Sequence, residues 1–318
     1  MASWQPAAGL GQLRARAALL TRIRRFFAAR NIIEVETPLL CSSGITDPAI
    51  ESLRVERGDS LTGPRYLQTS PEYAMKRLLA RDGEPIFQIA RAFRDGEAGA
   101  RHNPEFTLLE WYRPGFDHHQ LMAEVAELVQ YCLGERTLQK RSYRELFTEL
   151  LALDPFTAST AELATTARRQ IDTGTLAGDR DLWLDLLMSH LIEPQLAALG
   201  MVFVYDYPAS QAALSRVIEV DGFRVGQRFE LYVDGLELAN GYFELSDVGE
   251  QRDRFEADNT RRRECGLAQR PLDEHLLAAL AHGLPDCSGV ALGVDRLLML
   301  ASGISDIRQV LAFDWERA

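Results

Sequence analysis

The sequence of 318 residues has no long apolar run and no cysteine pattern that would support a crosslinked or zinc-bound fold. No stretch reaches the roughly 18 apolar residues that a membrane span needs, and the N-terminal segment lacks the core of a signal peptide. We therefore expect a cytoplasmic protein without a membrane partner. The four cysteines, Cys41, Cys132, Cys265 and Cys287, are scattered without CxxC spacing, which argues against a disulfide framework and against structural zinc.

An excess of positive charge and the common nucleotide-binding loops are also absent. The formal net charge of -11 gives no support to a broad nucleic-acid surface. There is no Walker P-loop and no GxGxxG opening a βαβ unit. The composition, with 46% hydrophobic and 25% charged residues, is that of an ordinary globular protein long enough to bury a sizeable core.

The most informative stretch is residues 85–114, which reads as two strands joined by a polar loop. Apolar residues alternate over 85–94, glycines and a proline break the pattern, and a second run covers 105–112. Period 2 puts four side chains on one face of the second strand: Phe106, Leu108, Glu110 and Tyr112. This row suits a planar base beside an amine, while Arg94, His102 and Asn103 supply donors for an anion at the mouth of the hairpin.

A second hairpin is predicted over residues 224–245, with its turn at Asp234-Gly235. Glu230, Glu237 and Glu244 recur in it every seven residues. Carboxylates on central strands are costly to bury without a cation, and oxygen ligands of this kind suit Mg²⁺. Because Glu237 and Glu244 differ in parity, both face one site only if the strand bulges, and we expect the bulge at Asn240-Gly241.

The remaining pattern is mostly helical scaffold. An amphipathic helix over 10–27 leads into a strand over 31–36, and a strand over 65–69 leads to Ser70 as N-cap, Pro71 as first helical residue and a helix over 73–80. The other predicted elements are helices over 117–133, 142–150, 161–170 and 181–199, a strand over 201–207, and a strand from 287 that passes into a helix near residue 294.

Several of these stretches resemble motifs of class II aminoacyl-tRNA synthetases in their lysyl-type version. The resemblance rests on helix 10–27 with the strand before Pro38 (motif 1), on Phe93-Arg94 with RHNPEF and LEWY (motif 2), on GVALGVDRL (motif 3), and on TSPE and ELANGYFEL. These stretches occur in the family's order along nearly the whole chain. The resemblance implies an α+β fold with an antiparallel β-sheet flanked by helices, and one catalytic domain over residues 1–318.

For the nucleotide, the resemblance implies that Arg94 and Arg296 are catalytic and grip the α- and γ-phosphates of ATP. It places Phe106 and Gly293 against adenine and Mg²⁺ on Glu230 and Glu237. The further nucleotide-binding residues that we expect are Asp95, Gly96, His102, Asn103, Glu237 and Leu238. One departure from the family is Gly96, because the family has a glutamate there, and here the acid is the next residue, Glu97.

For the amino acid, the resemblance implies a substrate with two amines. Glu72 meets the α-amino group, Glu244 the side-chain amine and Asn240 the substrate, and we expect Ser70, Pro71, Glu110, Tyr112 and Ala291 in the same pocket. Ala291 stands where the lysyl-type motif 3 has a glycine. We expect its methyl group to favour β-lysine over α-lysine, since one methyl against a ligand shifts discrimination by about 10- to 200-fold.

Motif 1 begins within the first 40 residues, which leaves no room for the anticodon-binding domain of lysyl-tRNA synthetases. The resemblance is therefore to the freestanding paralogues of that family. It implies an AMP-forming ligase that activates (R)-β-lysine or lysine with ATP and transfers it to a lysine of elongation factor P, as a cytoplasmic homodimer without a tRNA partner. Two alternatives remain open: a truncated synthetase that charges tRNA, and a non-catalytic paralogue that binds an amino acid.

Overall fold

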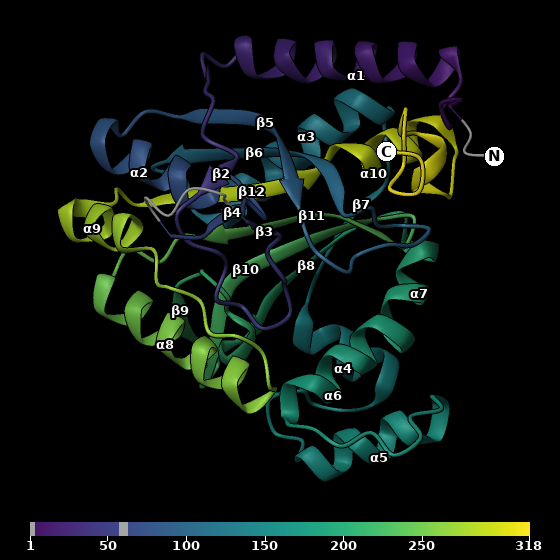
Figure 1. Cartoon of the computed structure of the whole chain (residues 1–318). Helices are drawn as coiled ribbons and strands as arrows, with labels where there is room; N and C mark the ends of the chain where they lie inside the picture. The colour runs from purple at the N-terminus through teal and green to yellow at the C-terminus, as the bar shows by residue number, and fades with distance from the viewer. Residues whose placement is uncertain (1–3, 57–62) are drawn as a thin grey trace.

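The computed structural model describes residues 4–56 and 63–318, and a nine-stranded sheet runs through its centre (Figure 1). Across these residues the strand order is β1-β5-β6-β12-β11-β10-β8-β7, with β9 paired to β10. The strands are β1 Ile33–Glu34, β5 Ile86–Phe93, β6 Glu105–Pro114, β7 Leu138–Ser142, β8 Met201–Pro208, β9 Val217–Val220, β10 Phe223–Val233, β11 Leu236–Phe243 and β12 Cys287–Gly293. Among the strand pairs of this sheet in residues 4–56 and 63–318, only β1–β5 and β7–β8 are parallel. The α+β fold with a largely antiparallel sheet is confirmed.

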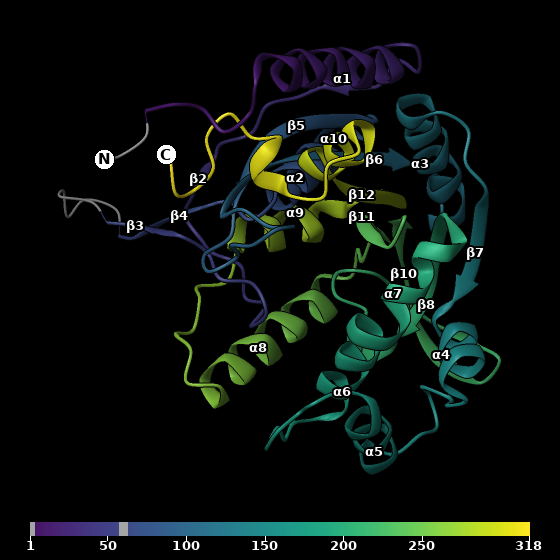
Figure 2. The same ribbon diagram turned by 90° about the vertical axis from the view of Figure 1, so that its right-hand side faces the viewer.

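Helices cover the two faces of this sheet differently (Figures 1 and 2). The helices are α1 Leu10–Ala28, α2 Glu72–Asp82, α3 His118–Leu133, α4 Tyr143–Leu151, α5 Thr160–Gln170, α6 Arg180–Leu187, α7 Glu193–Leu196, α8 Val248–Glu264, α9 Glu274–Gly283 and α10 Val294–Ser302. Helices α1, α3 and α10 pack on one face and form the main core with it. On the other face, α2, α8 and α9 cover one end and α4 to α7 the other, as two separate clusters. The strip of sheet between them is the floor of the candidate site.

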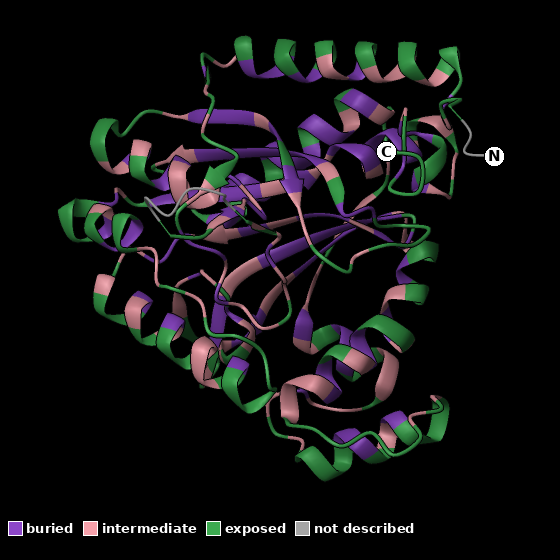
Figure 3. Ribbon diagram, in the orientation of Figure 1, coloured by how far each residue is buried: buried purple, intermediate pink, exposed green. Residues whose placement is uncertain are grey.

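The burial pattern follows from strand alternation (Figure 3). Phe87, Leu109, Trp111 and Phe229 point into the main core and are at most 2% exposed. Their strand neighbours point to the opposite face, because successive side chains of a strand alternate. A small second sheet of order β2-β4-β3 (Leu40–Cys41, Arg65–Leu67 and Arg54–Val55) lies beside α2. In the described residues, no helix is long and apolar enough to cross a membrane.

Both predicted hairpins form, and the structure corrects several boundaries. The strand expected over 31–36 shrinks to Ile33–Glu34. The helix expected over 181–199 is interrupted by a π-helical turn, Met188–Ile192, before Pro194. A proline inside a helix lacks the N–H for the ladder and crowds the carbonyl four residues earlier, which explains the interruption.

Two local predictions on the site elements were wrong in detail. Pro71, not Ser70, is the N-cap of α2, although the Ser70 hydroxyl still accepts a bond of 3.0 Å from the Glu72 N–H. The bulge in β11 lies at Leu238, since Leu231 pairs with Ala239 and Tyr232 with Glu237. Asn240 and Gly241 are regularly paired, so the change of parity precedes them.

Candidate active site

One row of side chains crosses the exposed strip of the sheet. The backbone register aligns Glu110 of β6 with Ala291 of β12, Ala291 with Asn240 of β11, and Asn240 with Glu230 of β10. These four residues come from the three stretches that the sequence singled out. The structure brings them together on one surface because neighbouring strands share a pleat.

A buried lysine occupies one end of this row. Lys76 of α2 is 1% exposed, and its Nζ lies 2.6 Å from Glu72 Oε1 and 2.6 Å from Glu244 Oε2. The Ser70 hydroxyl donates to Glu110 Oε2 at 2.8 Å and the Tyr112 hydroxyl to Glu110 Oε1 at 2.7 Å. We call these six residues, Ser70, Glu72, Lys76, Glu110, Tyr112 and Glu244, the Lys76 cluster.

The Lys76 cluster holds three acids around one cation, and the pKa values of Glu110, Glu244 and Lys76 reflect this imbalance. Burial and the charge of Glu72 raise the pKa of Glu110 to about 8. Burial also raises the pKa of Glu244, against the opposing effect of Lys76. Burial by itself would lower the pKa of Lys76, but Glu244 and Glu72 raise it above its ordinary value. The cluster therefore keeps a permanent internal cation and has capacity for further positive charge.

Gly289 makes room for this cluster. A Cβ atom on Gly289 would lie 2.3 Å from Tyr112 Cε1 and 2.4 Å from Glu244 Oε1. No real side chain tolerates such contacts, so a glycine is required here for Tyr112 and Glu244 to meet. Ala291, two residues further along β12, is half-buried on the same face.

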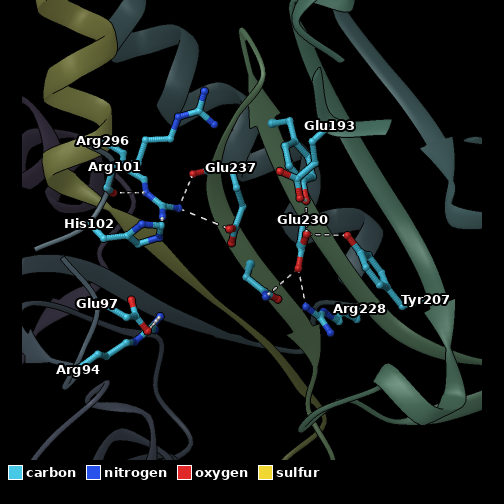
Figure 4. Close-up of polar contacts among 12 residues, drawn as sticks. Arg94, Glu97, Arg101, His102, Glu193, Tyr207, Arg228, Glu230, Glu237 and Arg296 are labelled. Carbon is cyan, nitrogen blue, oxygen red and sulfur yellow. Dashed lines mark hydrogen bonds and ion pairs between the residues drawn. The ribbon is translucent and has the colours of Figure 1, made fainter. Parts of the chain in front are cut away.

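Arg94 and Arg296 lie beside Glu97, His102 and Glu237, away from the row of four residues (Figure 4). Arg296, in the first turn of α10, donates to the backbone oxygen of Glu237 at 2.8 Å and lies 3.4 Å from its carboxylate. Its other terminal nitrogen is 2.7 Å from His102 Nε2. Burial and the charge of Arg296 lower the pKa of His102, so the neutral ring accepts this bond. Arg94, Glu97, His102, Glu237 and Arg296 form what we call the Arg296 cluster.

Arg94 is presented at the end of β5 with its guanidinium partly free. Its Cζ lies 5.1 Å above the centroid of the Phe106 ring, and one terminal nitrogen is 3.8 Å from Glu97. Its Nε is buried and has no hydrogen-bond partner within the described part of the chain. The next N–H, that of Asp95, donates to the backbone oxygen of Glu51 at 2.9 Å, and Gly96 follows with a φ of 78°. Arg94 is thus held by its backbone and retains a donor for an anion.

Two of the residues expected at the nucleotide, Asn103 and Leu238, are buried. Asn103 is buried; its Nδ2 donates to the backbone oxygen of Glu105 at 2.6 Å, and its Oδ1 accepts from the Trp315 N–H at 3.0 Å. Leu238 is 2% exposed and lies at the bulge of β11. Gly293 lies directly before α10, and a Cβ there would meet only the Arg296 side chain, at 3.5 Å.

Glu230, the last residue of the row, is saturated with donors (Figure 4). Tyr207 and Tyr232 each donate to its Oε2 at 2.6 Å, and Asn240 donates to its Oε1 at 3.1 Å. Arg228 also bonds Oε1. We call these five residues the Glu230 network. Four donors fill the lone pairs that a carboxylate offers, so Glu230 is not the open ligand that the sequence predicts.

Glu237 is the more accessible of the two expected metal ligands. In the described residues its carboxylate contacts only Arg296, and its side chain is 39% exposed. Desolvation and the charge of Glu230 raise its pKa. No group of three or more histidine, cysteine or acidic side chains is arranged to hold a metal within the described ranges.

The sequence did not identify Lys76, Tyr207, Arg228 and Glu193 as site residues. Lys76 lies in the MKRLL stretch after TSPE, and four-residue spacing from Glu72 was the signal that could have revealed their ion pair. Glu193 follows the π-helical turn, where burial and the charges of Glu230 and Glu237 raise its pKa to about 7. Strand alternation from Glu230 was the signal for Arg228, two residues earlier on β10. No sequence pattern indicated Tyr207, because its position depends on a backbone irregularity in β8.

Comparison with known proteins identifies the class. The family model for class II tRNA synthetases (D, K and N) matches residues 10–317, and the chain belongs to this family. Three relatives carry the name elongation factor P–(R)-beta-lysine ligase. The relative from Pseudoalteromonas translucida is 49% identical over 99% of this chain and 98% of its own length. The relative from Pasteurella multocida is 47% identical over 99% of this chain and 98% of its own length. The relative from Edwardsiella ictaluri is 48% identical over 100% of this chain and 99% of its own length.

Proposed function

We propose that this chain is an ATP-dependent ligase that activates (R)-β-lysine, or lysine, and transfers it to a lysine ε-amine of elongation factor P. The observation that carries the proposal is a single site on the sheet in which surplus acids surround Lys76 near Glu110, while Arg94 and Arg296 lie beside Glu97, His102 and Glu237. A diamino acid brings two ammonium groups and ATP brings a polyanion. The names of the full-length relatives supply the acceptor and the isomer.

In the first step the substrate carboxylate attacks the α-phosphorus of ATP, and pyrophosphate leaves. Charge develops on the phosphate oxygens, where Arg94 and Arg296 stabilise it. The Lys76 cluster holds the two amines, with Asn240 and Ala291 beneath the chain that joins them to the reacting carboxylate. The product is an aminoacyl-adenylate.

In the second step the acceptor ε-amine, in its neutral form, attacks the carbonyl carbon of the adenylate. An amide bond forms, AMP leaves, and the amine releases a proton to solvent. No described side chain is positioned as a general base for the acceptor lysine, which enters the site from solvent. Positioning of the two reactants therefore carries this step.

Mg²⁺ fits the arginine end of the site. Glu237 would hold this ion through oxygen, the type of ligand that it prefers, and Glu230, which its protein donors keep in place, would supply a second negative charge nearby. When bound, the ion would add positive charge beside the phosphates.

The remaining proposals concern the oligomeric state, the domain organisation and the cellular location. Helix α1, strand β1 and the following segment leave apolar residues exposed: Leu10, Leu13, Ile33, Leu39 and Leu40. We propose that this surface forms a homodimer interface, which the molar mass in solution tests. Residues 1–318 would act as one catalytic domain, in the cytoplasm where ATP and the acceptor are found.

Two assays test the proposed activity. Pyrophosphate exchange with (R)-β-lysine and lysine measures adenylate formation, and its absence with both would favour the amino-acid-binding paralogue. Labelled substrate offered to elongation factor P and to tRNA in parallel measures transfer. We expect labelling of the protein; efficient charging of tRNA with no labelled protein would overturn the proposed acceptor.

A further inference from the structure

Tyr207 lies outside every motif of the family, yet its hydroxyl reaches the site. It is 4% exposed and donates to Glu230 Oε2 at 2.6 Å. The Arg228 guanidinium lies 4.5 Å above its ring and bonds the same carboxylate. Figure 4 shows all three side chains converging from β8 and β10.

Regular strand alternation would turn Tyr207 to the opposite face. In β8, Met201 and Phe203 point into the main core and Tyr205 packs against it, whereas Val202 and Val204 point to the other face. Period 2 assigns position 207 to the face of Phe203. Instead Tyr207 packs in the cluster of Val202 and Val204, so the parity of the strand changes after Tyr205.

The change occurs at Asp206. Its φ is 58°, a left-handed value. The register pairs Tyr205 with Phe229 and then Tyr207 with Gly226, so two β10 residues oppose Asp206 alone. This is a β-bulge, which re-aims side chains near active sites. The Asp206 carboxylate lies on the α3 side, 3.9 Å from His118 Nε2.

We infer that Tyr207 is a positioning residue that orients Glu230, and that the left-handed backbone of Asp206 places it there. The kink turns the next side chain to the site, where its hydroxyl shares Glu230 Oε2 with Tyr232. Aspartate, asparagine and glycine adopt this conformation with little strain, whereas a β-branched residue does not. The inference rests on the proposed function, because it assigns Glu230 to the ATP end of the site.

ATP affinity of the full chain, measured by calorimetry with Mg²⁺ present, tests the role of Tyr207 without requiring turnover. We expect Tyr207→Phe to weaken ATP binding by about tenfold, since a hydrogen bond to a charged group is lost. The KM for the lysine-type substrate in pyrophosphate exchange should stay within about twofold, because that pocket is separate. Tyr205→Phe, on the core face of the same strand, is the matched control and should change neither value.

Substitutions at Asp206 test the kink. Asp206→Gly and Asp206→Asn should bind ATP like the wild type, and Asp206→Val should weaken binding at least as much as Tyr207→Phe. Adding Tyr207→Phe to Asp206→Val should then cost nothing further, because the hydroxyl is already misplaced. If Asp206→Val does not fold, Asp206→Ala replaces it in the cycle, with the unfolding midpoint recorded for each variant.

Each outcome has a distinct meaning. Equal ATP affinity in Tyr207→Phe and the wild type overturns the role of Tyr207. Additive losses in the double variant, or weakened binding in Asp206→Gly, overturn the role of the kink. Absence of exchange in the wild type with both lysine isomers contradicts the proposed function instead, and the calorimetric comparison still stands by itself.

Discussion

The Lys76 cluster and the Glu230 network both bury carboxylates on one sheet, but they neutralise them differently. Around Lys76, one ammonium serves Glu72 and Glu244, and Glu110 has only hydroxyl donors. Around Glu230, two hydroxyls, an amide and a guanidinium fill a single carboxylate. The first region is short of positive charge, so it suits incoming amines. The second is satisfied in advance, so it suits a structural part of a nucleotide site.

The largest effect should come from removing the internal cation. Lys76→Met leaves the buried Glu244 and the half-buried Glu72 without their cation, and breaking a buried pair in this way typically costs about 3–5 kcal/mol of stability. The pKa of Glu244, which burial already raises, should rise further in the folded variant because its cation is lost. Protons are then taken up on folding, and the loss of stability should grow as pH increases. Chemical unfolding at several pH values measures this.

Two further variants separate charge from packing. Lys76→Met combined with Glu244→Gln removes one of the stranded charges and should recover part of the stability. Arg77→Met, at the exposed neighbouring position of α2, should leave stability unchanged. A double variant as unstable as Lys76→Met would show that the ion pairs with Glu244 do not account for the loss.

The second prediction tests the arginine end. Arg94→Ala should reduce pyrophosphate exchange by about 10²- to 10³-fold, because a donor aimed at developing phosphate charge is lost. The fold should survive, since the Arg94 side chain has only Glu97 and the Phe106 ring as side-chain partners in the described residues. Arg91→Ala, on β5 with a long ion pair of 3.6 Å to Glu105, is the control. Undiminished exchange in Arg94→Ala would contradict its role.

The sequence predicted regular elements of the site better than its irregular ones. Glu110 on a regular strand and Arg296 at a helix start lie where the pattern placed them, because strand parity and helix position follow from local sequence. The position of the β11 bulge, the kink at Asp206 and the buried state of Lys76 did not follow. They depend on which strands pair and on how acids from different elements share one cation, which no local pattern records.

A third prediction uses the pKa of Glu110, which burial and Glu72 raise to about 8. The neutral acid predominates below that pH and the carboxylate above it, and only the carboxylate attracts an ammonium. kcat/KM for the lysine-type substrate should therefore rise with pH up to about 8, by at most about tenfold per unit. The side-chain amine of the substrate stays protonated over this pH range, since its pKa is about 10.4, so it does not counteract the rise in kcat/KM.

Glu110→Gln is the corresponding control, since its amide cannot ionise. In this variant the rise of kcat/KM towards pH 8 should disappear. Only the rise caused by ionisation of Glu244, which lies at lower pH, should remain. Ionisation of Glu110 affects folding stability in the opposite direction to activity. Because the pKa of Glu110 is higher in the folded state than in the unfolded state, the wild type should lose stability as pH rises from about 4.5 to about 8. An unchanged pH profile in Glu110→Gln would separate Glu110 from amine binding.

The smallest expected effect concerns Ala291, which lies in register between Glu110 and Asn240. Its methyl group stands on the site face midway between the two ends, where the substrate carbon that carries the first amine would lie. Removing it should give α-lysine more room, while β-lysine, whose amine is one carbon further on, gains little. We expect Ala291→Gly to raise kcat/KM for α-lysine relative to (R)-β-lysine by about tenfold, the low end for one methyl against a ligand.

The ratio of the two kcat/KM values is the decisive quantity, because an added glycine also loosens the strand by about 0.5–1 kcal/mol for both substrates alike. Ala239→Gly supplies the control: it lies one residue before Asn240 in β11 and points into the main core. That variant should lower stability without altering the ratio. If Ala291→Gly leaves the ratio unchanged as well, the methyl fills space in the sheet surface, and discrimination between the isomers must come from the spacing of Glu72 and Glu244.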